Sequence, residues 1–230
     1  MRRSDKKQEF SMTDFFSTSH RQLQKEYDTT LMADRLLDSA VTEQLSTKQS
    51  AFIHRSNMFF LSTVDEFGFP TCSYKGGQAG FVRVIKNNKL VFPSYDGNGM
   101  FLSMGNIESH NKIGMLFIDF ERPNRLRISG EARCIAKGPL VDSYPGADLV
   151  VEVLVRNVWV NCPRYIHPMQ SLGQSPYIPD EEGVATIALW KRIDLMQDVL
   201  NDQDRIEAAS LGLITIEKYE MYVAEGKLLG

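Results

Sequence analysis

The sequence predicts a mainly β protein, an antiparallel barrel with flanking helices and a helical C-terminal appendage. Short runs rich in β-branched and aromatic residues recur between residues 57 and 170, and turn residues such as Gly, Asn and Asp separate them. The segments on either side have apolar residues three and four positions apart, a spacing typical of amphipathic helices. We therefore expect three regions: an N-terminal arm with helices (1–56), the barrel domain (57–170) and the appendage (171–230).

The N-terminal region is polar, and its apolar residues are spaced for short helices. Residues 1–18 have the composition of a mobile arm. Helices are expected around residues 33–37 and 49–53. Ser46 and Thr47 precede the second helix, where a hydroxyl can accept a hydrogen bond from the first backbone N–H groups.

Strands are predicted where apolar residues alternate or run continuously for a few positions. Residues 81–85 alternate, as in a half-buried strand, whereas 113–120 is apolar almost throughout, which is typical of a strand buried on both faces. The predicted strands cover residues 58–64, 70–74, 81–85, 90–92, 113–120, 126–129 and 149–160. One helix is expected within this region, near residues 99–108.

The composition changes from Pro176 onward. Residues 178–207 contain eight acidic and three basic side chains, a local charge of −5. Helical spacing recurs at residues 192–199, 203–211 and 214–223. We interpret this region as an appendage packed on the barrel rather than as a separate catalytic domain.

Composition also excludes several classes of protein. Of the 230 residues, 43% are apolar and 24% charged, a balance typical of globular domains. The net charge of −3 gives no reason to expect a nucleic acid or an anionic membrane as partner. No apolar run reaches the roughly 18–20 residues that span a bilayer, and no apolar segment of a secretory signal follows the basic N-terminus.

Cysteine and histidine usage predicts a cytoplasmic protein without a bound metal. Cys72, Cys134 and Cys162 are odd in number and widely spaced, so neither a disulfide framework nor a zinc site is expected. The four histidines are scattered and form no metal-binding motif. Reduced thiols in a cytoplasm explain this pattern.

The first candidate ligand-binding segment is SYKGGQAG, residues 73–80, directly after a predicted strand. Its glycines let the backbone approach a ligand closely, and Lys75 can supply a positive charge for a phosphate or an electron-rich ring. A glycine-rich hairpin loop with a solvated lysine explains the same residues equally well.

A second candidate segment, residues 93–107, leads from a strand through a glycine-punctuated loop into the expected helix. Asn98 stands at the predicted N-cap. Backbone N–H groups at a helix start, beside the hydroxyls of Ser94 and Tyr95, would form a seat for an anion. A capped helix after a tight turn is the alternative.

Two further segments carry cationic or reactive side chains. Arg125 and Arg127 alternate with aliphatic residues, so both guanidinium groups share one face of a strand, although a polar outer face of the sheet explains this too. The segment NCPRYIHP, residues 161–168, ends a long strand with two prolines that restrict its backbone. Such a rigid loop can present side chains to a site, and a simple proline-held turn is the alternative.

Together these segments resemble the flavin-nucleotide-binding proteins related to pyridoxamine 5′-phosphate oxidase. The resemblance covers residues 57–167, about half of the chain. It rests on the motifs TVDEFGFP (63–70), YKGG (74–77), GFVRV (80–84), YDGNGM (95–100), GNI (105–107), LFIDF (116–120), RLR (125–127) and NCPRYIH (161–167). It implies a six-stranded FMN-binding split barrel that forms a homodimer, with FMN held in two clefts at the dimer interface.

The resemblance also implies which residues bind FMN. Those along the edge of the isoalloxazine ring would be Ser73, Tyr74, Lys75, Gly76 and Gly77. Those around the ribityl phosphate would be Ser94, Tyr95, Asn98, Gly99 and Ser103. Arg125 would reach toward the ring. The loop that closes the cleft would contribute Asn161, Cys162 and Arg164. This loop could belong to the same subunit or to the partner subunit.

The chain departs from the oxidase at positions that neutralise the phosphate. The oxidase has an arginine where this chain has Ser73, and a basic pair where it has Leu102 and Ser103. We therefore do not expect oxidation of pyridoxamine phosphate. The positive charge would come instead from Lys75, Arg83 or Arg125.

The function that follows is an FMN-dependent oxidoreductase acting on an unidentified small molecule, with a nicotinamide as a candidate electron donor. The flavin would supply the redox chemistry, and the protein its binding and electrostatics. No catalytic acid or base is assigned. Tyr165 and His167 are the nearest candidates, with packing as their alternative role. The alternative function is a flavin- or haem-binding module without turnover, acting as a carrier or sensor.

Overall fold

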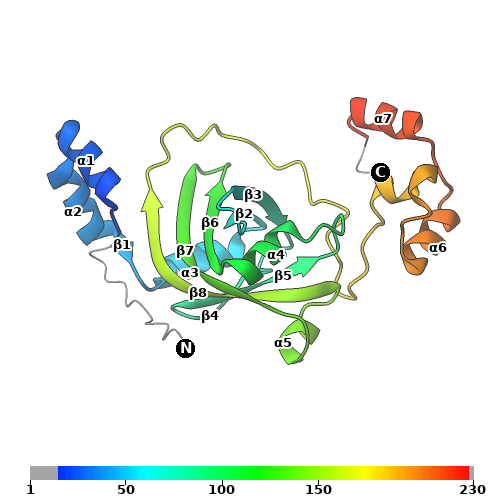
Figure 1. Cartoon of the computed structure of the whole chain (residues 1–230), viewed down its shortest axis with the longest axis horizontal. Coiled ribbons are helices and arrows are strands. Elements are labelled where there is room, and N and C mark those ends of the chain that lie inside the picture. The colour runs from blue at the N-terminus through cyan, green and yellow to red at the C-terminus, as the bar shows by residue number, and fades with distance from the viewer. Residues whose placement is uncertain (1–14, 228–230) are drawn as a thin grey trace. The chain divides into compact units, whose positions relative to one another are not determined.

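The computed structural model describes residues 15–227, so most of the arm expected over residues 1–18 lies outside the described part of the chain. The chain divides into two compact units, with the boundary between Val41 and Thr42 (Figure 1). The first unit consists of two helices. The second contains the sheet, the helices around it and the C-terminal segment.

The first unit is a helical hairpin of α1 (Thr18–Glu26) and α2 (Thr30–Ala40). Ser17 caps α1, because its Oγ accepts a hydrogen bond from the backbone N–H of His20. Arg21 on α1 forms an ion pair with Asp34 on α2, which joins the two helices. The helix expected around residues 33–37 is confirmed as part of α2.

The second unit is built on an antiparallel sheet in the strand order β3-β2-β6-β7-β8-β5-β4. Hairpins supply most neighbours in this order, and the pairs β2–β6 and β5–β8 join the hairpins to one another. The strands are β2 (Met58–Val64), β3 (Pro70–Gly76), β4 (Arg83–Lys86), β5 (Lys89–Tyr95), β6 (Lys112–Asp119), β7 (Asn124–Ile135) and β8 (Ala147–Asn161). The short strand β1 (Val41–Thr42), at the boundary between the units, brings the sheet to eight strands.

The prediction of a six-stranded barrel is therefore wrong. A two-residue strand such as β1 is too short to produce an alternating pattern, so the sequence carries no signal for it. β3 and β4 stand at the two ends of the strand order, and the sheet formed by the described residues is not closed. The fold is mainly antiparallel β with several helices, which is consistent with a split barrel.

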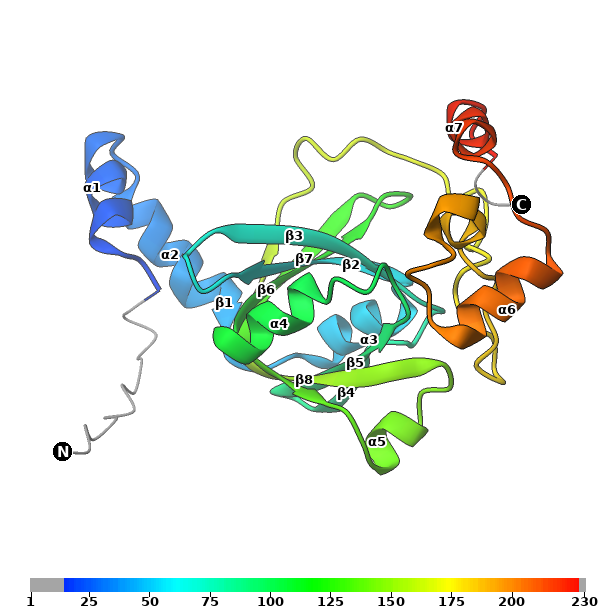
Figure 2. The same ribbon diagram turned by 45° about the vertical axis from the view of Figure 1, so that its right-hand side comes forward.

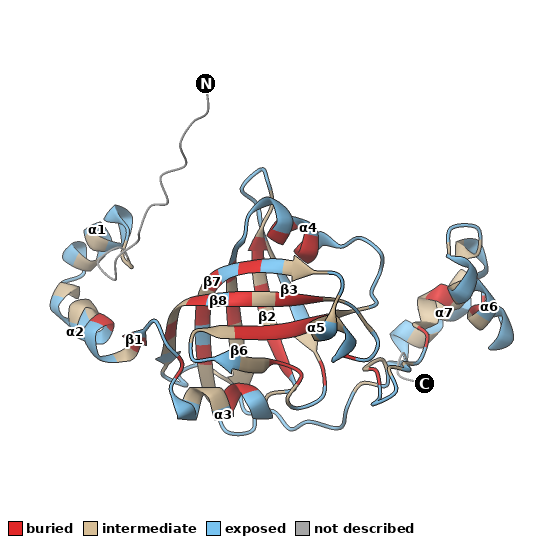
Figure 3. Ribbon diagram, turned by 90° about the horizontal axis from the view of Figure 1, so that it is seen from below, coloured by how far each residue is buried: buried red, intermediate tan, exposed pale blue. Residues whose placement is uncertain are grey.

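The core of the second unit is rich in phenylalanine. Phe59 is fully buried, and its ring centroid lies 5.0 to 5.8 Å from those of Phe81, Phe92 and Phe117. Buried positions alternate with more exposed ones along the strands, as the red and paler bands in Figure 3 show. β6 follows this alternation, so the prediction that it is buried on both faces is wrong. Its outer apolar side chains, such as Leu116, remain partly exposed.

Two helices, α3 (Thr47–Arg55) and α4 (Leu102–Ser109), contact the sheet, α3 at β4 and α4 at β2 and β7 (Figure 2). The predicted cap of α3 is confirmed, because Ser46 Oγ accepts a hydrogen bond from the Gln49 backbone N–H. α4 begins three residues later than the sequence predicted, so Phe101 rather than Asn98 stands at its N-cap. The single-turn helix α5 (Pro139–Asp142) precedes β8.

The C-terminal segment is helical in part. The predicted helices at residues 203–211 and 214–223 are present, whereas 192–199 forms only short 3₁₀ turns. The elements are η2 (Leu189–Arg192), η3 (Asp194–Met196), α6 (Asp202–Ser210) and α7 (Ile216–Ala224). Over residues 15–227, no helix has the length and apolar character needed to cross a membrane.

Candidate functional site

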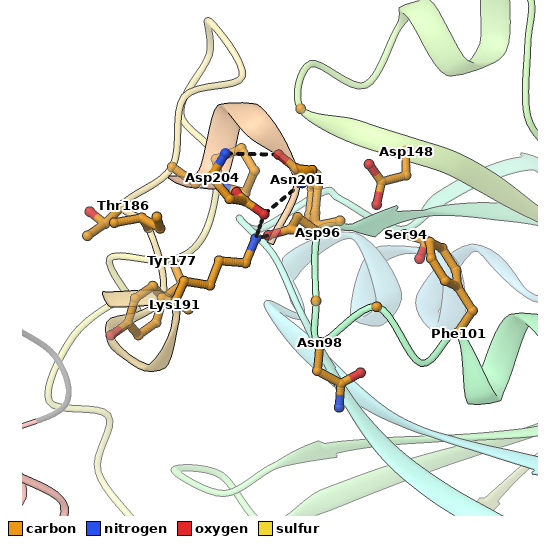
Figure 4. Close-up of a pocket in the computed structure, with 18 of the residues that line it drawn as sticks. Ser94, Asp96, Asn98, Phe101, Asp148, Tyr177, Thr186, Lys191, Asn201 and Asp204 are labelled. Atoms are coloured by element: carbon orange, nitrogen blue, oxygen red, sulfur yellow. Dashed lines mark hydrogen bonds and ion pairs between the residues drawn. The ribbon is translucent and has the colours of Figure 1, made fainter. Parts of the chain in front are cut away.

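Half of the predicted cofactor residues line one cavity of about 740 Å³ in the second unit. The cavity lies between the ends of β3 and β5, the start of α4, and residues 177–207 of the C-terminal segment (Figure 4). The predicted residues that it brings together form the cavity group: Ser73, Lys75, Ser94, Tyr95, Asn98, Gly99 and Ser103.

Strand alternation explains why Ser73 and Lys75 reach the cavity and Tyr74 does not. Successive side chains of β3 point to opposite faces of the sheet. Tyr74 is exposed on the other face, where its ring meets Phe60 edge-on at 6.0 Å between centroids, and it lines a separate cavity of about 490 Å³. The structure therefore separates Tyr74 from the cavity group.

Side-chain hydrogen bonds hold α4 against β2 and β3. The hydroxyls of Ser73 and Ser103 lie 2.8 Å apart. The Asn106 amide donates to Thr63 Oγ1 at 3.0 Å, and the hydroxyls of Thr63 and Thr71 lie 2.8 Å apart. Because Thr63, Ser103 and Asn106 are buried, these bonds satisfy polar groups that have little access to water. They fix α4 relative to β3.

The start of α4 presents backbone donors without a side-chain cap. Phe101 occupies the N-cap position in the left-handed conformation, with φ of 49°, and its side chain makes no capping hydrogen bond. Leu102 and Ser103, the first two residues of the helix, line the cavity. An uncapped helix start attracts anions because its first N–H groups lack partners within the helix and the helix dipole is positive there.

Asn98 is not the N-cap that the sequence predicted. Its side-chain oxygen accepts a hydrogen bond from the Met100 backbone N–H at 3.1 Å, which closes a turn ahead of the helix. Residues 99–101 then intervene before α4 begins. The prediction failed because an asparagine side chain can close a short turn as well as cap a helix, and the local sequence does not distinguish the two roles.

Lys75 is the cation of the cavity group. Burial lowers the pKa of its ammonium group. No ion pair in the described part of the chain involves it. Arg83, another predicted source of positive charge, does not line the cavity, because its guanidinium donates to the Ser143 hydroxyl and carbonyl, each at 2.8 Å, and lies over the Tyr144 ring.

The C-terminal segment adds a charged wall to the cavity that sequence reasoning missed. Lys191 is only 4% exposed, and its Nζ lies 2.6 Å from a carboxylate oxygen of Asp96 and 2.9 Å from one of Asp204 (Figure 4). Asp148 lines the same cavity, and burial together with the charge of Asp96 raises its pKa. The one sequence signal was the presence of Lys191, beside Arg192, within the mainly acidic run at 178–207.

Gly77 is needed for packing, because a Cβ there would lie 2.3 Å from the ring of the buried Phe81. A Cβ on Gly76 would lie 2.9 Å from the exposed ring of Tyr74, which can shift. Neither glycine lines the cavity. Gly77 lets the end of β3 pass close to the core, and the approach of either glycine to a ligand stays a prediction.

The remaining predicted residues form a loop group at the other end of β8: Arg125, Asn161, Cys162 and Arg164. Arg125 pairs with Asn161 across β7 and β8, and its Nε is buried without a hydrogen-bond partner among the described residues. A backbone hydrogen bond from Arg164, with the charges of Arg164 and Arg125, lowers the pKa of the exposed Cys162 thiol. No member of the loop group lines the cavity.

Residues 45–172 match the protein-family model described as pyridoxamine 5′-phosphate oxidase. The chain belongs to the pyridoxamine 5′-phosphate oxidase family. The matched region covers more than half of the chain and contains both the cavity group and the loop group. Of the charged wall, Asp96 and Asp148 lie inside it, whereas Lys191 and Asp204 lie outside it.

Solved structures with a related fold are similar to this chain only at low identity. HupZ from Group A Streptococcus is 18% identical, with a TM-score of 0.43 over 50% of this chain and 93% of that chain. A putative pyridoxamine 5′-phosphate oxidase from Lactobacillus delbrueckii is 20% identical, with a TM-score of 0.42 over 51% and 95%. HutZ, the haem storage protein from Vibrio cholerae, is 16% identical, with a TM-score of 0.38 over 51% and 94%. The search of curated proteins found no match.

Members of the pyridoxamine 5′-phosphate oxidase family usually bind a flavin, and the cavity group fits a phosphorylated one. The uncapped start of α4 supplies N–H donors, the serines supply hydroxyls, and Lys75 supplies a positive charge that forms no ion pair with a carboxylate of residues 15–227. The two carboxylates around Lys191 outweigh its single charge, and Asp148 and Glu207 add further carboxylates to the lining, which leaves Lys75 and the helix start as the groups that favour an anion.

Proposed function

We propose that the chain binds FMN in the cavity and acts as a flavin-dependent oxidoreductase on a small molecule other than pyridoxamine phosphate. The observation that carries this proposal is the convergence on one cavity of the uncapped start of α4, the buried Ser103 hydroxyl and the Lys75 ammonium, which has no ion-pair partner among the described residues. Three free cysteines support a reducing compartment such as the cytoplasm.

Each residue has a distinct task in this proposal. The N–H groups of Leu102 and Ser103 would hold the phosphate, and Ser94 would donate a hydroxyl to it. Lys75 would stabilise negative charge on the ring, and Ser73 would position Ser103 through their hydrogen bond. Bound FMN would supply the electron-transfer chemistry, which the side chains of the cavity do not provide.

The position of the loop group supports a homodimer with FMN at the interface, and members of the family are commonly dimers. Tyr95, in the cavity group, pairs with Ala147 at one end of β8, whereas Asn161 lies at the other end. At about 3.3 Å per residue the two ends are roughly 45 Å apart along the curved strand. In a dimer of the kind common in the family, the loop group of a second copy would complete the site.

A non-catalytic role as a flavin carrier or sensor is the second candidate. No histidine or cysteine is found among the described residues that line the cavity, so a proton donor that titrates near neutral pH is missing from its walls. Tyr165 and His167, the acid–base candidates, lie outside the cavity on the loop after β8.

The absorption spectrum of the purified protein, followed by titration with FMN and with riboflavin, tests the proposal. We expect flavin bands and tighter binding of FMN than of riboflavin, because only FMN presents a phosphate to α4. Equal affinities would contradict the phosphate site, and a Soret band would indicate haem instead. Anaerobic stopped-flow mixing with NADH or NADPH separates the enzyme from the carrier, since only the enzyme should reduce its flavin.

A further inference from the structure

The C-terminal segment forms part of the cavity although it lies outside the region matched to the family. We call residues 177–207 the strap. Residues 177–188 of the strap contain neither helix nor strand, and their backbone hydrogen bonds are largely local, such as those joining Asp180 to Gly183 and Val184. A segment of this kind can move without breaking a sheet.

One ion-pair network ties the strap to the sheet. Lys191 on η2 contacts Asp204 within the strap and Asp96 on the loop between β5 and α4. Although burial alone would lower the pKa of Lys191, its hydrogen bonds to Asp204 and Asp96 raise it, so the group stays charged. The Asp96 loop also carries Asn98 and Gly99 of the cavity group.

A second contact lies where two glycine backbones meet. Gly183 of the strap and Gly146, just before β8, both have positive φ, of 85° and 76°. A Cβ on Gly183 would lie 2.6 Å from the backbone nitrogen of Gly146, so only glycine permits this approach. This contact is a close packing of two backbones and involves no ion pair.

We propose that the strap is a gate over the cofactor cavity, and that the Lys191–Asp96 ion pair is the latch that keeps it closed. This inference rests on the proposed function for the identity of the ligand. With the latch formed, the strap and the loop that leads into α4 move together and shield a bound cofactor. Breaking the latch loosens the strap, which keeps its contact at Gly146 and the hydrogen bond from the Gln78 side chain to the Pro179 carbonyl, while Lys191 keeps Asp204 as its partner.

The variant Asp96→Asn tests the latch, because it removes the charge that bridges the two segments and leaves the Lys191–Asp204 pair intact. Asp96 is largely exposed, so the substitution is not expected to unfold the protein. We expect hydrogen exchange in residues 177–190 of the ligand-free protein, and release of FMN in stopped-flow, each to become about fivefold faster. Asp198→Asn, an exposed aspartate of the same strap, is the matched control and should behave as the wild type.

The two readouts separate this inference from the proposed function. Unchanged hydrogen exchange in Asp96→Asn would overturn the latch whatever happens to FMN. Faster exchange with unchanged FMN release would overturn the gate. If the wild type does not bind FMN, the proposed function fails, and the exchange measurement still decides whether Asp96 holds the strap. Gly183→Ala, which breaks the second contact, should accelerate exchange in the same residues.

Discussion

The cavity group and the loop group were predicted as parts of one site, yet the fold holds them in different ways. The cavity group sits where a strand and a helix are joined by buried hydrogen bonds such as Ser73–Ser103. The loop group sits at the end of β8, where Cys162 and Arg164 are exposed. One region is organised within the chain, whereas the other has polar groups such as Arg125 Nε that the described chain leaves without a partner.

This difference teaches how a long strand distributes a site. β8 reaches from one end of the cavity group to the loop group, whereas Ser73 of the cavity group lies in the same register row as Ile128, three strands away and three residues from Arg125. If both groups bind FMN, the loop group comes either from the same chain or from a second copy. If only the cavity group binds it, the loop group has another task.

The largest expected effect comes from changing one residue in each group. Ser103→Asp places a carboxylate at the proposed phosphate position. The fold should tolerate this change, because negative charge is favourable at a helix start. Arg125→Glu reverses a charge in the loop group. Each variant alone should bind FMN at least about 100-fold more weakly. In a homodimer with shared sites, an equal mixture should recover about a quarter of the wild-type sites, because half of the dimers are mixed and each of those has one intact site.

Fluorescence titration of the mixture measures this recovery, with native mass spectrometry to verify that subunits exchange. Ser109→Asp adds the same charge at the far end of α4 and serves as the control for Ser103→Asp. Mixed dimers that form without recovering FMN binding would show that the two groups do not share a ligand between two copies.

A second prediction separates packing from binding in the predicted glycine pair. Gly77→Ala should destabilise the fold by about 2 kcal/mol, because the new methyl group overlaps the Phe81 ring in the core. Gly97→Ala, with no atom within 4 Å of the added Cβ, is the control and should change stability little. Urea denaturation gives both free energies of unfolding. A Gly77→Ala protein of wild-type stability would mean that Phe81 moves aside freely.

A third prediction concerns the charge of the cavity group. Lys75→Met should weaken FMN binding about tenfold, because it removes an ammonium that forms no ion pair with the described carboxylates. Burial lowers the pKa of Lys75, so the wild type should lose affinity for FMN as pH rises through that lowered value, below the usual 10.5. Lys75→Met should lack this loss, and Lys86→Ala, an exposed lysine on β4, should bind as the wild type. If the FMN affinities of wild type and Lys75→Met depend on pH in the same way, Lys75 does not belong to the site.

The smallest expected effect is on thiol reactivity, and it probes the loop group. Iodoacetamide should modify Cys162 faster than Cys134, because nearby arginines lower the pKa of Cys162, whereas burial and Glu108 raise that of Cys134 to about 12. Peptide mass spectrometry over a time course gives both rates. FMN should slow the labelling of Cys162 by a few fold if the loop group closes over the ligand, and equal rates with and without FMN would place the loop group elsewhere.

Local patterns predicted much of the fold, and half of the residues that they proposed for cofactor binding line one cavity. Alternation along β3 is enough to place Ser73 and Lys75 on one face, and Ser46 lies next to the helix that it caps. The charged wall depends on contacts between residues that are far apart in the chain, since Lys191 and Asp96 are joined only by the tertiary fold. The same reason explains why the sequence did not show that Arg83 lies away from the cavity, because its partners Ser143 and Tyr144 lie 60 and 61 residues further along the chain. The prediction that Asn98 caps α4 failed for a local reason, because an asparagine side chain can either close a short turn or cap a helix.

The row of hydroxyl and amide groups beneath α4 has a consequence for ligand choice. Ser73–Ser103 and Thr63–Asn106 fasten helix and sheet at two points, so α4 can neither slide along β3 nor tilt without leaving a buried polar group unsatisfied. In the proposed site, the fixed distance between the helix start and the strand end would therefore select ligands by their length. A ligand whose negative group is too near or too far from its ring meets one of the two elements, and only a matching length meets both.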